Sequence, residues 1–301
     1  MKFKSWTIGT LILFFIYFIL TPLAAFSQTK TLDWTGCGIT KKAFMSEMAV
    51  QYEKKTGIAI KLSGGGATKG IRAASAGTSD LGGTCRHLLM QDGKLHPEEN
   101  NVKLVQVAWD ALVAITNKNN PIENISSVDL KKVYDGSIIS WKDLGQPEDK
   151  RIVLCSREGT VSGVGHMFRL LALNAPGEEF KAKSLKFKST GPLEKKIKST
   201  PTALGLTGIS SAKKADVKIL AIDGIKPTKE NIASGKYPLF RPLYITVNRD
   251  QSPDVKDFLA FIISDEGQKI ISEEGTVNLQ EGKTLNAFWQ ERSTKYEYHT
   301  E

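Results

Sequence analysis

The chain has 301 residues, of which 41% are hydrophobic and 24% are charged, and its formal net charge is +9. This composition is ordinary for a globular protein, so it excludes an intrinsically disordered chain, and the length allows two compact lobes. The surplus of basic residues favours anionic partners in general, but it does not by itself distinguish a small anion from nucleic acid or an anionic membrane.

The first 27 residues have the pattern of an export signal. Two lysines precede an apolar run over residues 6–20, and Ala25 and Ser27 are small residues at the positions that signal peptidase reads. We therefore expect a signal peptide over residues 1–27, cleavage after Ser27 and a soluble periplasmic protein. An uncleaved membrane anchor is the alternative, because the run is almost long enough to span a bilayer. Pro22 breaks the run and favours cleavage.

The next segments alternate between strands and helices. A strand is expected over Thr31–Trp34, followed by a helix over Thr40–Lys55 that has one apolar face and ends at Gly57. A second strand over Ile58–Leu62 leads to a glycine-rich loop, Ser63–Thr68, which opens a further helix. This alternation predicts a mainly parallel sheet with helices on both faces, so the fold class is α/β.

Two long extended segments are expected to connect two lobes. Val102–Thr116 is apolar and rich in β-branched residues, and it is long enough to leave one lobe and enter another. Helical patterning then continues to about Lys236, and Leu239–Val247 returns as an extended strand. Ser252 and Pro253 start an amphipathic helix after it. Two crossings between lobes predict a hinge.

Three glycine-containing loops that precede helices could bind an anion: residues 36–40, 63–68 and 159–165. Each would offer unpaired backbone N–H groups and the positive end of a helix dipole. None is a P-loop or a complete dinucleotide fingerprint, and one glycine of this kind more often serves backbone geometry than a ligand. Arg157 adds a planar donor fork that suits a tetrahedral oxyanion, although an ion pair with Glu158 is the alternative.

Five segments carry a resemblance to a known family: NPIENI at residues 120–125, LKKVYDG at 130–136, WKDLG at 141–145, YPLFRPLY at 237–244 and EGQKII at 266–271. In this order, and over essentially the whole mature chain, the sequence resembles the phosphate-binding proteins of phosphate ABC transporters. The resemblance implies a type II periplasmic-binding-protein fold, in which two α/β lobes joined by a two-strand hinge close on a dehydrated anion. Lobe I would comprise residues 28–108 and 245–301, and lobe II residues 109–244.

The same resemblance implies which residues bind the anion. They lie in four segments: Gly38, Ile39 and Thr40; Ala67 and Thr68; Cys85 and Arg86; and Arg157, Ser162, Gly163 and Val164. Two positions depart from the family's pattern. Cys85 stands where the best-known sites have an aspartate that accepts a hydrogen bond from protonated phosphate, and Val164 stands where a threonine is expected. Loss of the carboxylate should favour a more highly charged or unprotonated anion.

Three cysteines, Cys37, Cys85 and Cys155, form no CxxC pair, and the resemblance implies that their segments meet at the cleft. The simpler interpretation is one disulfide, for example Cys37 with Cys85, and a buried Cys155. The alternative is a copper or zinc site made from the three thiols with His87 or His166, because thiolate and imidazole suit these metals. No other cofactor is expected, and no Ser/His/Asp order or carboxylate pair predicts an enzyme.

These features predict a monomeric, extracytoplasmic solute-binding protein that captures phosphate or a related oxyanion for an ABC permease in the inner membrane. A ligand sensor or adaptor on the same fold is one alternative, and the metal protein described above is another. The densest lysine cluster, residues 181–188, and the lysines that follow at residues 195–198 are interpreted as solvated surface, so no nucleic-acid partner is expected.

Overall fold

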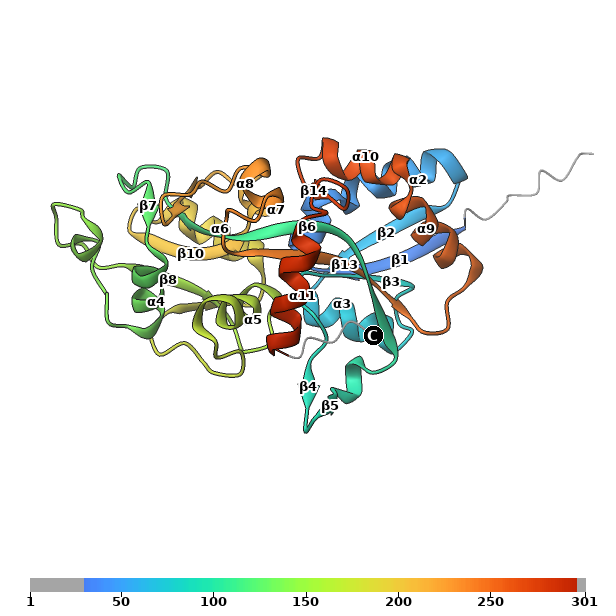
Figure 1. Ribbon diagram of the computed structural model, residues 1–301, viewed down its shortest axis with the longest axis horizontal. Helices are drawn as coiled ribbons and strands as arrows, with labels where there is room; N and C mark the ends of the chain where they lie inside the picture. Colours follow the sequence, from blue (N-terminus) through green and yellow to red (C-terminus); the bar gives the residue numbers. More distant parts are fainter. Residues whose placement is uncertain (1–29, 297–301) are drawn as a thin grey trace, which may run out of the picture.

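The computed structural model describes residues 30–296, so the predicted signal peptide, residues 1–27, lies outside the described residues. Figure 1 shows an elongated molecule with two α/β lobes and two strands, β6 and β13, that run between them. The strands of the main sheet follow the order β2-β1-β3-β13-β6-β10-β8-β9, with the two crossing strands in the middle. The α/β fold with two lobes and a two-strand connection, expected from the sequence, is confirmed.

The first lobe contains the parallel strands β1 (Thr31–Gly36), β2 (Ala59–Gly64) and β3 (Leu81–Thr84). The helix predicted after β1 is present as α1 (Gly38–Thr40), a π-helical segment (Lys41–Met45) and α2 (Ser46–Thr56). It ends where predicted, because Gly57 has a φ of +75°, which favours glycine. The lobe also holds α3 (Ala67–Ser75), β4 (Met90–Gln91), β5 (Lys94–Leu95), a 3-10 turn (Pro97–Glu99), α9 (Pro253–Ile263) and α10 (Asp265–Glu273).

The crossing strand predicted from the sequence is a single strand, β6 (Val102–Thr116). Its residues 102–111 pair antiparallel with β13 (Phe240–Asn248), and its residues 112–116 pair with β10 (Ala203–Gly208). Strand β13 pairs in turn with β3 of the first lobe. Strand β6 therefore forms backbone hydrogen bonds with strands of both lobes.

The second lobe contains β10 and the parallel strands β8 (Val153–Arg157) and β9 (Leu185–Phe187). The helical region expected here was too long, because strands interrupt it. All six residues of β10 are buried, and a short apolar run buried on both sides lacks the alternation that distinguishes a strand from a helix. The other elements are β7 (Asn124–Ile125), α4 (Ser127–Asp135), a 3-10 turn (Lys142–Leu144), α5 (Gly163–Phe168), a π-helical segment (Arg169–Leu173), α6 (Thr190–Ser199), α7 (Ile209–Ala212), β11 (Lys218–Ile219), β12 (Ala221–Ile222) and α8 (Lys229–Ala233).

The last helix, α11 (Leu285–Tyr296), lies across the crossing strands after the short strand β14 (Val277–Asn278), as Figure 1 shows. The ring of Trp289 lies 6.2 Å from that of Trp109 on β6 and 6.4 Å from that of Phe240 on β13. Helix α11 therefore packs on the strands that the two lobes share. Across residues 30–296 the longest helices are too short or too polar to cross a membrane.

Candidate functional site

The three predicted loops meet where the two lobes touch. Gly66 N donates to Gly36 O at 3.2 Å, which joins the loops after β1 and β2. A Cβ atom added to Gly163, in the first turn of α5, would lie 2.6 Å from Cys85 Sγ and 2.8 Å from Ala67 Cβ. Only glycine allows so close an approach of lobe II to lobe I, so the four segments named by the resemblance come together.

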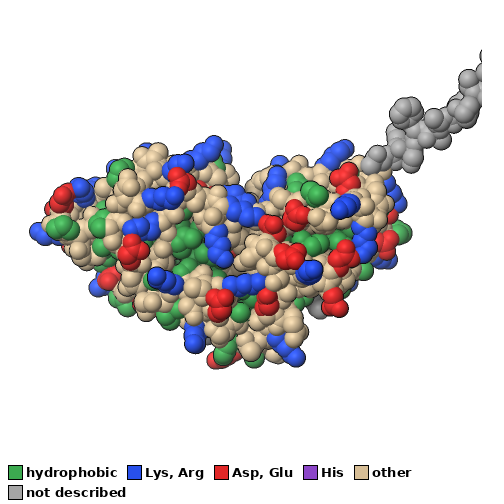
Figure 2. Space-filling model, turned by 90° about the horizontal axis from the view of Figure 1, so that it is seen from above, with side chains coloured by type: hydrophobic (Ala, Val, Ile, Leu, Met, Phe, Trp, Pro, Cys, Tyr) green, Lys and Arg blue, Asp and Glu red, His purple; other side chains and the backbone are tan. Residues whose placement is uncertain are grey.

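The lobes are in contact around this point, so the structure represents a closed form. Thr68 Oγ1 donates to Val161 O at 2.8 Å, and Arg86 Nε donates to the same oxygen at 3.1 Å. On the face of the molecule seen in Figure 2, a notch separates the two lobes, and Lys and Arg side chains lie beside it. Anions that approach this notch meet positive charge.

At the first loop, the sulfur of Cys37 caps the start of α1. Thr40 N donates to Cys37 Sγ at 3.4 Å, and Thr40 Oγ1 lies 3.2 Å from the same sulfur. Thr40 is fully buried, and its hydroxyl also reaches Cys37 O at 3.0 Å. The donors that the resemblance assigns to the anion at Thr40 are therefore in contact with a cysteine.

Cys85 is a neighbour of Cys37, and each side chain shifts the pKa of the other. Both are buried, unbridged thiol groups, so the disulfide considered from the sequence is not formed in this structure. Burial by itself raises the pKa of Cys37, but hydrogen bonds from Cys85 and Thr40 and the charge of Arg241 outweigh it and lower the pKa to about 6. The hydrogen bond to Cys37 and burial raise the pKa of Cys85 well above its usual value. The lowered pKa favours the thiolate form of Cys37 near neutral pH, and the raised pKa favours the thiol form of Cys85.

Arg241 is a residue of the site that sequence reasoning missed. Its Nη2 donates to Asp110 Oδ2 at 3.1 Å, and both side chains are fully buried. Its Nη1 reaches Gly163 O at 3.4 Å. Burial opposes the charge of Arg241, but the cysteine pair and Asp110 keep its pKa raised. The available signal was a charged residue within an apolar strand, because a buried charge needs a partner.

Arg157 is anchored through all three nitrogens of its guanidinium group. Nε donates to Phe187 O at 3.1 Å, Nη1 to Thr190 Oγ1 at 3.2 Å and Nη2 to Lys188 O at 2.6 Å. Nη2 also lies 3.8 Å from the point where a Cβ of Gly66 would be. Burial lowers the pKa of Arg157. Its acceptors are neutral, so its positive charge is available to an anion.

Arg86 is held by protein groups instead. Its five N–H groups reach Val161 O, His87 O, Thr68 Oγ1 and both oxygens of Glu99, at 2.6 to 3.1 Å. These bonds from Arg86 lower the pKa of Glu99 although burial opposes the charge. The sequence predicted direct anion contacts for Arg86 and Thr68. In this structure the Arg86 N–H groups and the Thr68 hydroxyl are bound to protein groups instead. Both side chains join lobe I to Val161 of lobe II.

The remaining predicted contacts lie at the start of α5. Ser162 caps this helix, because its Oγ accepts from Gly165 N at 3.2 Å. Gly163 and Val164 follow in the first turn, where backbone N–H groups have no partner within the helix. The Val164 side chain is buried, so only its backbone could meet an anion. Gly38 and Ile39 occupy the equivalent first turn of α1.

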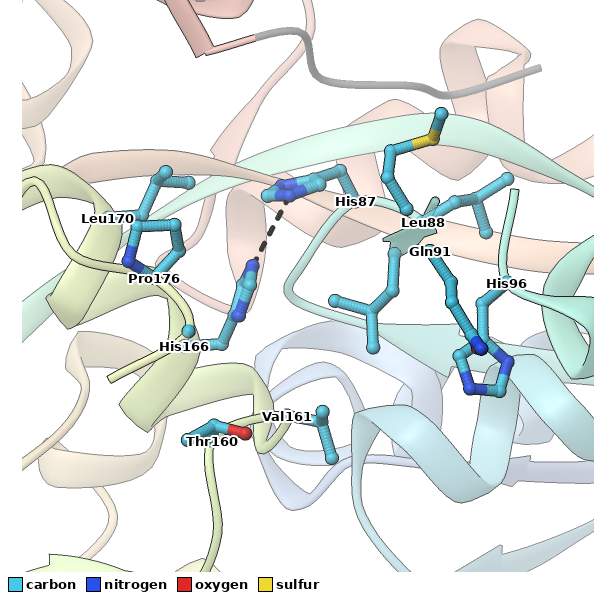
Figure 3. A pocket seen from close by; sticks show the side chains of 12 residues that line it. His87, Leu88, Gln91, His96, Thr160, Val161, His166, Leu170 and Pro176 are labelled. Atoms are coloured by element: carbon cyan, nitrogen blue, oxygen red, sulfur yellow. Dashed lines mark hydrogen bonds between the residues drawn. The ribbon is translucent and has the colours of Figure 1, made fainter. Parts of the chain in front are cut away.

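The metal site considered from the sequence is not assembled. Cys155 Sγ lies 3.8 Å from Val153 O, and burial raises the pKa of Cys155 to about 11. His87 Nε2 and His166 Nε2 lie 3.3 Å apart at a pocket of about 350 Å³ (Figure 3). No group of three or more His, Cys, Asp or Glu in the described part of the chain is placed to hold a metal ion. The structure pairs two cysteines and two histidines, but it does not gather the predicted ligand set.

Comparisons with known proteins agree with this arrangement. A family model described as a PBP superfamily domain matches residues 37–266. Phosphate-binding protein PstS of Borreliella burgdorferi is 29% identical over 255 residues, which cover 81% of this chain and 89% of that protein.

Two solved structures are similar over the whole of their length. One, from Clostridium perfringens, is described as a phosphate ABC transporter substrate-binding protein with bound phosphate; it has a TM-score of 0.71 and 27% identity, and covers 83% of this chain and 99% of that one. An ABC-type phosphate transport receptor from Vibrio cholerae has a TM-score of 0.63 and 26% identity, and covers 83% of this chain and 100% of that one. Because the family model spans most of the described residues, the chain belongs to the PBP superfamily.

Proposed function

We propose that this protein captures phosphate or a related tetrahedral oxyanion between its lobes and delivers it to an ABC permease in the inner membrane. The observation that carries the proposal is the close approach of Gly163 of lobe II to Cys85 and Ala67 of lobe I. Arg157 Nη2 lies beside Gly66, and Thr40 N lies at the start of α1. Such a site offers backbone donors and one available guanidinium group to an anion removed from water. The relatives and structures described above, named for phosphate binding and transport, support the same ligand.

An extracytoplasmic location and a binding role without catalysis belong to the same proposal. The relatives are described as binding proteins and transport receptors, and the export pattern of residues 1–27 agrees with uptake from outside the cytoplasm. Removal of the signal after Ser27 would release the lobes into the periplasm. A monomeric state and the lack of a nucleic-acid partner stay predictions.

The direct test is calorimetry with phosphate, arsenate, sulfate, molybdate and a phosphonate. We expect phosphate or one of the other tetrahedral oxyanions to bind, and no heat with any of them would contradict the proposal. The variant Gly163→Ala should bind at least about tenfold more weakly, because its new methyl group would meet Cys85 and Ala67 when the lobes close.

A matched control separates closure from folding. Gly177→Ala adds the same methyl group where no protein atom lies within 4 Å. We expect this variant to bind like the wild type, and we expect both variants to keep the wild-type melting temperature without ligand. Equal affinity of all three proteins would show that the ligand does not bind at the point where Gly163 meets lobe I.

A further inference from the structure

The Cys37–Cys85 pair occupies the hydrogen-bond donors that an anion would use. The inference drawn from this contact rests on the proposed function. Cys37 Sγ accepts from Thr40 N at 3.4 Å and lies 3.2 Å from Thr40 Oγ1. The sulfur thus accepts hydrogen bonds that one oxygen of a bound anion would otherwise accept. An incoming oxyanion has to share these donors with the sulfur or replace it.

The charges around the pair nearly cancel when Cys37 is a thiolate. Arg241 and Asp110 form a buried ion pair beside the cysteines, and Arg157 is the further cation that faces them. Thr40 of α1 and Gly83 of β3 contact Cys37, Gly163 of α5 approaches Cys85, and all three are uncharged. The thiolate therefore balances Arg157 while the site is free of ligand.

An oxyanion brings a second negative charge into this enclosed space. Two like charges that face each other in a region of low dielectric repel strongly, and the repulsion favours protonation of one of them. Arg157, Arg241 and Asp110 are all held in hydrogen bonds, whereas the cysteine pair can take up a proton without breaking an ion pair. A protonated Cys37 would also become a weak donor toward the ligand.

We propose that Cys37 is the proton acceptor of the anion site, so that capture of one oxyanion is coupled to the uptake of one proton by the Cys37–Cys85 pair. The proton comes to the protein, and the ligand itself need not carry one. This arrangement differs from an acceptor carboxylate, which requires a protonated ligand. The pair thereby determines which anions the site accepts, with preference for fully charged tetrahedral oxyanions.

The coupling has a definite sign. The complex binds more protons than the free protein at pH values above about 6, where the lowered pKa of Cys37 leaves it ionised. Raising the pH therefore weakens binding, by up to about tenfold per pH unit until the bound pair also ionises. A site without the thiolate would show only the pH dependence of the anion's own ionisation.

The test combines thiolate absorbance in the ultraviolet with calorimetry, on the purified mature protein near neutral pH. The free wild type should show one thiolate, which disappears when phosphate is added. Calorimetry in buffers of different ionisation enthalpy should give about one more proton taken up by the wild type than by Cys37→Ser. Between about pH 7 and pH 8, the ratio of wild-type to Cys37→Ser affinity for phosphate should fall about tenfold. Cys155→Ala, which changes a buried cysteine outside the pair, should behave like the wild type.

The outcomes separate the two proposals. If the free protein has no thiolate near neutral pH, or if phosphate binds without loss of the thiolate, the role of Cys37 is overturned while phosphate binding stands. If the thiolate is present but phosphate gives no heat, the proposed function is contradicted instead. Equal proton uptake by the wild type and Cys37→Ser, with both binding phosphate, also overturns the coupling.

Discussion

Of three buried arginines near the site, two are paired with carboxylates and one is held only by neutral acceptors. Arg86 is neutralised by Glu99 and Arg241 by Asp110, whereas Arg157 contacts two carbonyl oxygens and one hydroxyl. A guanidinium group that already faces a carboxylate has little attraction left for a second anion. Arg157 is therefore the residue whose charge an oxyanion would meet.

This difference predicts the effect of removing the charge of Arg157. Arg157→Gln keeps a polar side chain of similar length but loses the charge, and a hydrogen bond to a charged group contributes roughly 1.5 to 3 kcal/mol. We expect phosphate affinity to fall by about 10- to 100-fold in calorimetry, with the far-ultraviolet circular dichroism unchanged. Affinity that falls by less than about twofold would show that Arg157 serves only to anchor the turn before α6.

At the scale of elements, α5 brings a buried histidine against the segment that follows β3. His166 Nε2 lies 3.3 Å from His87 Nε2, across the contact between the lobes, as Figure 3 shows. Burial, followed by the charge of Arg86, lowers the pKa of His166 to about 4. Protonation of this ring would place a cation beside Arg86 and Arg169.

The lowered pKa of His166 predicts sensitivity to acid. Between about pH 4 and the unfolded pKa of about 6.5, the unfolded state binds more protons, so the free energy of unfolding falls as the pH falls through this window. The loss due to His166 should approach about 2 kcal/mol at pH 5. Urea unfolding at pH 7 and about pH 5 should show this loss in the wild type and a smaller one in His166→Gln. The same loss in both proteins would assign the acid sensitivity to other groups.

The elements also show which parts of the fold sequence patterns could predict. The crossing strand β6 was predicted with its bounds because the β-branched residues of its long apolar run favour a strand over a helix. Strand β10 was missed, since six buried residues show no alternation. The gathering of loops at the site followed from the resemblance. The ion pair of Arg241 with Asp110 joins positions 131 residues apart, and only the pairing of β13 with β6 brings them together.

On the scale of the whole molecule, closure depends on contacts made by side chains of both lobes. Lys42, on the helix after β1, donates to Glu194 of α6 at 2.9 Å and to Ser211 of α7 at 2.9 Å. Glu194 is buried and also accepts from Thr207 at 2.8 Å. If the lobes separated, Glu194 would be left facing water without its cation. The Lys42 side chain is bound to groups of lobe II, so this cluster can adjust the balance between the open and closed forms.

Loss of the lysine should therefore shift that balance. In Lys42→Met the closed form would keep a buried carboxylate without its cation, whereas the open form would hydrate it, so the open form gains about 1 kcal/mol. We expect roughly fivefold weaker phosphate binding, and a larger radius of gyration of the ligand-free protein in small-angle X-ray scattering. Lys55→Met is the matched control, because Lys55 pairs with Glu266 within lobe I and both side chains are exposed. A change of the same size in Lys55→Met would point to general charge, and an unchanged radius with unchanged affinity in Lys42→Met would show that the Lys42–Glu194 contact does not control closure.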